Sequence, residues 1–153
     1  MLARYKKQGG FEQLLNLIET SNPKKQETFL KLIGEESKPT VDLIREKMLS
    51  PDKIFSWEQS FLIEITTQIP VKVLAICLYG RSPEIVTKAI ATFTHMQKQE
   101  IQAMMNDKKP TPGEVDAANM KLIQTVRGLN KAKVIRLEKI DPKLDFPMDL
   151  KVA

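Results

Sequence analysis

Few side chains in this chain of 153 residues are of the types that do chemistry. Its one cysteine, Cys77, lies in an apolar run over residues 73–78, and its one histidine, His95, has no second histidine or cysteine pair at metal-ligand spacing. A cysteine in an apolar run predicts a buried, inert thiol. A lone histidine predicts a polar surface or helix-packing residue rather than a catalytic base. We therefore predict no catalytic, metal-binding or cofactor-binding residues.

The motifs of common enzymes are also missing from the sequence. It contains no glycine-rich phosphate loop and no nucleophile elbow, and one cysteine cannot build a structural zinc site. These observations indicate a protein that is not an enzyme. A hydrolase with a pair of carboxylates in a cleft stays open, because a sequence alone does not show a cleft.

Composition and charge indicate the class of protein. Apolar residues make up 42% and charged residues 28% of the chain, which is the balance of a soluble globular protein. The longest apolar run is far shorter than the roughly 20 residues that span a bilayer. Gln8–Gly10 interrupts any signal-peptide core after Met1. We expect a cytoplasmic protein without a small-molecule substrate.

A net charge of +5 raises the question of a nucleic acid or an anionic lipid as partner. The lysine clusters, however, are far apart in the sequence, and the nine aromatic residues offer little base-stacking surface. We interpret the lysines as solvated helix faces, with contact to a membrane only indirect. The lysine clusters are Lys6–Lys7, Lys24–Lys25, Lys108–Lys109 and Lys131 to Lys133.

The elements that must position any site are helices. Proline follows a capping residue in Asn22–Pro23, Ser50–Pro51, Ser82–Pro83 and Thr111–Pro112, and each pair is typical of a helix start. Apolar residues recur at helical spacing behind these starts. The predicted helices cover residues 9–20, 23–34, 39–48, 57–68, 70–79, 83–93, 95–106 and 112–131.

Short helices with short connections predict an all-α fold, an armadillo- or HEAT-like right-handed stack followed by a small helical C-terminal unit. The predicted division is an armadillo-like unit over residues 1–48, a hinge or connector over 49–56, a C-terminal helical unit over 57–140 and an extended tail over 141–153. Residues 134–140 are expected to be extended or a short helix.

Three short motifs keep the spacing of a known family. They are Gly9–Gly10, the helix end at Met48 and the segment Ile76 to Gly80. With Ser82–Pro83 and the predicted last helix they resemble, over about 130 residues, the C-terminal half of the flagellar motor switch protein FliG. The resemblance implies a rotor-ring scaffold in motility and chemotaxis, at the cytoplasmic face of the inner membrane in the flagellar basal body. Its partners would be FliM-like proteins, neighbouring FliG-like subunits and the stator protein MotA.

The resemblance implies a hinge where the family has Met-Phe-x-Phe. This chain has Met48, Leu49, Ser50 and Pro51 there. Leu49 can still fill an apolar pocket, while Ser50–Pro51 introduces a helix cap and a fixed backbone angle. We predict a stiffer hinge, with a plain interhelix turn as the alternative.

Most of the stator-pairing charges that the resemblance implies are missing. The family's lysine before glycine corresponds to Tyr79, an arginine to Met96, and an Asp-Asp pair to Ala103–Met104. A further arginine corresponds to Pro112, and an Asp-Asp-Arg segment to Glu58–Ser60. The candidate partner-facing residues are Tyr79, Arg81, Met96, Lys98, Glu100, Ala103 and Met104.

Two interpretations of the methionines around residue 100 stay open. Met96, Met104 and Met105 are either core residues, which the helical spacing favours, or an adaptable apolar contact surface. On the second interpretation the protein meets its partner by packing instead of ion pairs. The family's membrane-tethering portion precedes Gly9, so we expect recruitment by a partner unless the chain is a fragment.

The sequence therefore predicts a FliG-like scaffold that acts through protein contacts. The alternative is an armadillo-like adaptor whose basic face binds a peptide, a lipid headgroup or nucleic acid. The two should differ in salt dependence, because binding to phosphates weakens steeply with added salt.

Overall fold

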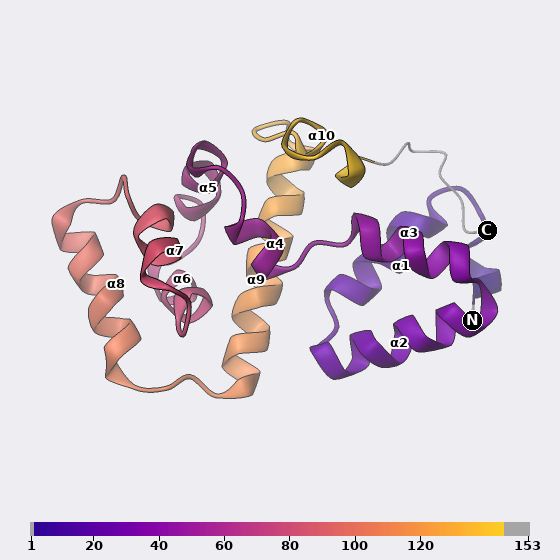
Figure 1. The fold of residues 1–153 in the computed structure, drawn as a ribbon, viewed down its shortest axis with the longest axis horizontal. Helices are drawn as coiled ribbons and strands as arrows, with labels where there is room; N and C mark the ends of the chain where they lie inside the picture. The colour runs from indigo at the N-terminus through magenta and orange to yellow at the C-terminus, as the bar shows by residue number, and fades with distance from the viewer. Residues whose placement is uncertain (1, 146–153) are drawn as a thin grey trace. The chain divides into compact units, whose positions relative to one another are not determined.

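The protein is helical throughout the part described. The computed structural model covers residues 2–145 with described placement, and within that range every regular element is a helix (Figure 1). The all-α prediction is confirmed. The contacts divide the chain into two compact units, one formed by residues 2–49 with 137–145 and the other by residues 50–136.

The first unit consists of four α-helices, the last of only four residues, and two 3-10 turns. Its helices are α1 (Gly10–Glu19), α2 (Pro23–Glu36), α3 (Lys38–Lys47) and α10 (Leu137–Ile140), with the 3-10 turns η1 (Leu2–Tyr5) and η2 (Pro142–Leu144). Helix α2 packs on α1 and α3, and η2 packs on α3 and α10. The core is aliphatic around one aromatic residue, with Phe11, Leu14, Ile18, Ile33 and Ile44 all buried.

The second unit is built around helix α6 (Val71–Leu78). Its other helices are α4 (Pro51–Phe55), α5 (Gln59–Thr66), α7 (Pro83–Ala89), α8 (His95–Asp107) and α9 (Pro112–Lys131). Helix α6 lies between α8 and α9 and contacts both extensively (Figure 1). Leu74, Cys77 and Leu78 of α6 are buried, so this helix forms the centre of the unit's core.

All four cap-and-proline pairs begin a helix. The side chains of Asn22, Ser50, Ser82 and Thr111 each accept a hydrogen bond from the backbone N–H three residues later. Each such bond satisfies a donor that the helix itself leaves unpaired, and the proline that follows has no donor to lose. The local sequence therefore fixes where these helices start.

The structure differs from the sequence prediction in the hinge region and near the C-terminus. The predicted connector over 49–56 contains helix α4, whose Ile54 and Phe55 are buried. Residues 137–145 pack with the first unit, whereas 137–140 were assigned to the second unit and 141–145 to an extended tail. Asp141 caps η2 by accepting from the N–H of Lys143 at 3.0 Å, and Leu144 is buried. The rest of the predicted tail, residues 146–153, lies outside the described residues.

The structure explains why glycine stands at both positions of the Gly9–Gly10 pair. Gly9 has φ of 78°, in the left-handed region that favours glycine. A Cβ on Gly10 would lie 1.9 Å from the carbonyl oxygen of Tyr5. Because that atom belongs to the backbone of η1, a side chain at residue 10 would displace the turn that closes over α1.

We predict that Gly10→Ala weakens the first unit. The added methyl group forces η1 away from α1 at a cost of roughly 1–3 kcal/mol. Hydrogen exchange of the α1 amides, followed by NMR, should speed up accordingly. Gly34→Ala is the matched control in the same unit, since its Cβ would meet Val41 Cγ1 at an ordinary 3.5 Å. Unchanged exchange in Gly10→Ala would contradict the close approach.

Candidate functional site

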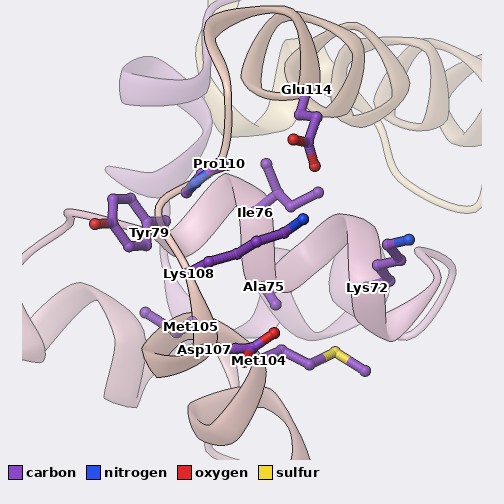
Figure 2. Close-up of a pocket in the computed structure, with 10 residues that line it drawn as sticks. All are labelled: Lys72, Ala75, Ile76, Tyr79, Met104, Met105, Asp107, Lys108, Pro110 and Glu114. Carbon is purple, nitrogen blue, oxygen red and sulfur yellow. The ribbon is translucent and has the colours of Figure 1, made fainter.

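A groove on the second unit is the main candidate site. It has a volume of about 340 Å³ and lies between α6, the C-terminal part of α8 and the loop that leads into α9 (Figure 2). Apolar groups form most of its lining. The lining residues are Lys72, Ala75, Ile76, Tyr79, Met104, Met105, Asp107, Lys108, Pro110 and Glu114.

The groove exists because α6 and α8 bury only part of their facing surfaces. Ile101 of α8 is fully buried, while Met104, one turn further on, is 38% exposed. On α6, Ala75 is buried and Ile76 half-buried. The chain then leaves α8 at Lys108 in an extended conformation, and Pro110 closes one end of the groove. The result is an open apolar depression between two helices.

Charged groups surround this apolar floor. Glu114 belongs to a capping box with Thr111, whose N–H donates to Glu114 Oε1 at 3.3 Å. This backbone hydrogen bond lowers the pKa of Glu114 below its usual value, with a further lowering from the Thr111 side chain and the charges of Lys108 and Lys72. In Figure 2 the Lys108 side chain extends across the groove. The two lysines and Glu114 therefore form one electrostatic group at the α6–α9 rim.

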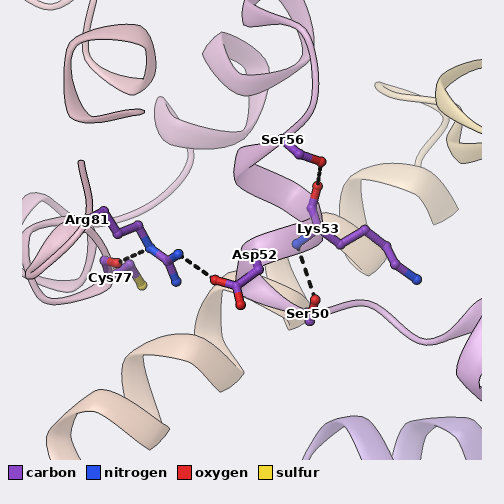
Figure 3. Close-up of polar contacts among 6 residues, drawn as sticks. All are labelled: Ser50, Asp52, Lys53, Ser56, Cys77 and Arg81. Atoms are coloured by element: carbon purple, nitrogen blue, oxygen red, sulfur yellow. Dashed lines mark hydrogen bonds and ion pairs between the residues drawn. The ribbon is translucent and has the colours of Figure 1, made fainter. Parts of the chain in front are cut away.

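Arg81 ties helix α4 to the end of α6. Its Nε donates to the carbonyl of Cys77 at 2.9 Å, and its Nη1 pairs with Asp52 Oδ1 at 2.7 Å (Figure 3). The guanidinium also lies 4.6 Å from the ring centroid of Phe55, a cation–π distance. Arg81 was predicted to face a partner. In the structure its guanidinium binds groups of its own unit instead.

The Cys77 side chain is buried on the side of α6 that faces α9. Its thiol donates to the carbonyl of Ala118 on α9 at 3.4 Å. Burial raises the pKa of Cys77 to about 12, against a smaller opposing effect from Arg81. The prediction of a buried thiol is confirmed, and the contact helps to hold α6 against α9.

The structure brings together two of the predicted partner-facing residues and separates the others. Tyr79 and Met104 both line the groove. Met96 is 79% exposed near the start of α8, so it is no core residue. Exposure of Met104 likewise excludes the core interpretation that the helical spacing favoured. The remaining three lie on α8 outside the groove: Lys98, Glu100 and Ala103.

The predicted hinge residues are anchored on both sides of the division between the units. Met48 packs on the core of the first unit. Leu49 is buried, and its N–H donates to the buried Glu19 carboxylate at 2.6 Å. Ser50 accepts the N–H of Lys53 at 3.2 Å, and Pro51 is the first residue of α4 (Figure 3).

Several groove residues were not recognised from the sequence. Lys72, Ala75 and Ile76 belong to a helix whose residues are all apolar except Lys72, so nothing in the pattern marks one face as a site. Glu114 gave the clearest available signal, because Thr111 and Glu114 have capping-box spacing.

Within residues 2–145, no three His, Cys, Asp or Glu side chains gather as they would around a metal ion. Nor is any helix in that range long and apolar enough to cross a membrane.

Two compact units, each built of helices, place this chain among the all-helical proteins. Within that class, the family model of the FliG C-terminal domain matches residues 31–137, well over half of the chain. The chain belongs to the FliG C-terminal domain family.

The full-length FliG from Aquifex aeolicus has a similar solved structure. It is 23% identical, with a TM-score of 0.50, and the match covers 82% of this chain and 39% of that one. At this identity the match concerns the fold. This chain thus spans about two fifths of that protein's length. No curated protein matches the sequence significantly.

We predict that Cys77 of the folded protein resists thiol reagents. A pKa of about 12 in place of 9.0 lowers the thiolate fraction at pH 8 about a thousandfold, and burial blocks access as well. Labelling with iodoacetamide should follow global unfolding as urea is added. Val134→Cys, at an exposed position, supplies a site that should label rapidly in the same sample. Rapid native labelling of Cys77 would show that α6 is not held against α9.

Proposed function

We propose that this chain is a flagellar motor switch scaffold that acts in the rotor ring through protein–protein contacts, without catalysis. Membership of the FliG C-terminal domain family supports the flagellar context. The observation that carries the proposal is the groove, because it brings Tyr79 and Met104 to one exposed apolar surface. The proposed place of action is the cytoplasmic face of the inner membrane, in the flagellar basal body.

The proposed contacts depend on packing more than on ion pairs. Tyr79, Met96, Ala103 and Met104 occupy positions where the family resemblance implies charges, and all four are exposed. Exposed ion pairs contribute little to affinity, whereas apolar groups that leave water on contact contribute in proportion to their area. We therefore propose FliM-like proteins, neighbouring FliG-like subunits and stator proteins such as MotA as partners that meet an apolar surface.

We predict that flagellar switch or stator proteins are retained by the purified chain from a lysate of its own organism, at both low and raised salt. Apolar contacts hold or strengthen as salt rises. Mass spectrometry of the retained proteins provides the measurement. Retention of nucleic acid or lipid, lost on raising the salt, would favour the basic adaptor instead, because phosphate contacts release counterions. Absence of every flagellar protein would contradict the proposal.

We also propose that Met48 to Pro51 forms a stiff hinge between the units. The Glu19 carboxylate fixes the N–H of Leu49, and the carbonyl of Ser50 accepts the N–H of Ile54 at 3.0 Å. Adjacent residues are thus anchored to different units, which leaves few backbone torsions free between them. Pro51 further restricts the residue before it.

Replacement of Pro51 by Ala should broaden the distribution of distances between the two units. Spin labels at Leu32→Cys and Val134→Cys, both exposed positions, allow the measurement by pulsed electron resonance in a Cys77→Ala background. Pro23→Ala is the matched control, because Pro23 is also the first residue of its helix but lies within the first unit. An unchanged distribution in Pro51→Ala would refute the stiffness.

A further inference from the structure

We propose that the groove between α6 and α8 binds an amphipathic helix of a partner protein. The helix inserts one large apolar side chain and places a carboxylate against Lys72 and Lys108. This inference rests on the proposed function and specifies the chemistry of the partner at the same site.

The size and lining of the groove suit an apolar anchor. A volume of about 340 Å³ falls near the lower end of ligand pockets, where about 300–1,000 Å³ is usual. It can accept one large side chain and part of the next. Ala75 and Ile76 form the floor from α6, and Tyr79 and Pro110 lie towards one end (Figure 2). A furrow between two packed helices is also the shape that receives a helix through its apolar face.

The walls can adapt to that anchor. Met104 and Met105 line the groove from α8, and unbranched methionine side chains repack around different apolar shapes. Met104 is exposed and Met105 half-buried. Covering them would remove apolar surface from water without rearranging the core beneath, where Ile101 is fully buried.

The charges of the rim give the partner helix its orientation. Among the residues that the structure describes, the side chains of Lys72 and Lys108 have no hydrogen bond or ion pair, although both are near enough to Glu114 to lower its pKa. Glu114 itself is engaged in the capping box of α9. Two lysines at the α6–α9 rim favour a carboxylate there. Asp107 lies on the α8 side of the groove, beside Met104 (Figure 2), and disfavours an acid at that rim.

The test is a selection from a phage-displayed library of helical peptides against the whole chain. Enriched peptides should carry a large apolar residue with Asp or Glu within one helical turn. Met104→Lys should weaken their binding about tenfold or more, because it puts a charge into the apolar contact. Met96→Lys is the matched control on the same helix and outside the groove, and should leave affinity unchanged. Both methionines are exposed, so neither change should disturb folding.

A charge reversal tests the orientation separately. Lys108→Glu should weaken the selected peptides by about fivefold at low salt, the effect expected of an exposed charge contact. Lys109→Glu changes the neighbouring lysine, which does not line the groove, and should have little effect. Equal effects of the two variants would overturn the assigned contact with the carboxylate.

Methionine methyl NMR locates the peptide. The methyl signals of Met104 and Met105 should shift on binding, while that of Met96 stays in place. Selected peptides without an apolar anchor, or shifts only outside the groove, would overturn the inference. Shifts of Met104 with rising concentration of the chain alone would identify a second copy as occupant and would also overturn it. These results do not depend on retention of flagellar proteins from lysate, so failure of the groove inference and failure of the proposed function are distinguishable.

Discussion

The candidate site depends on how helix α6 is buried. Its Leu74, Cys77 and Leu78 point into the core of the second unit, and the Cys77 thiol reaches the carbonyl of Ala118 on α9. With one side of α6 held against α9, its other side forms the floor of the groove below α8. Arg81 then fixes the end of the helix by binding the Cys77 carbonyl and Asp52. The part of the groove that α6 forms, with Ala75 and Ile76, therefore belongs to a helix held in place at its buried side and at its end.

Single hydrogen bonds also fix the backbone at residues 49 and 50, where the first unit ends and the second begins. A buried carboxylate normally needs a strong partner, and Glu19 accepts the N–H of Leu49. Directly afterwards, Ser50 serves as the cap of α4. One hydrogen bond therefore ends the first unit and another starts the second, within two adjacent residues. The serine cap and the proline at this point both specify a local backbone conformation.

The starts of most helices were predictable from the sequence, whereas the packing of the helices against one another was not. Helix starts at Pro23 and Pro112 were predictable because cap, proline and apolar spacing act within a few residues. Helix α4 was missed because five residues are too short to show periodicity, even though its Ser50–Pro51 start was visible. Tyr79 and Met104 were each singled out, but their meeting in one groove depends on how α6 and α8 pack. The burial of Leu144 likewise follows from the contact of η2 with α3. The sequence around Leu144 gives no indication of that contact.

Photo-crosslinking from the groove, in cells of the chain's own organism, tests most directly whether this surface meets a flagellar protein. A photoreactive phenylalanine analogue at position 104 is compared with the same analogue at position 96, on the same helix outside the groove. We expect position 104 to crosslink to a flagellar motor protein through an apolar helix, and position 96 to do so far less. Crosslinks from position 104 only to nucleic acid or to proteins outside the flagellum would contradict the central claim.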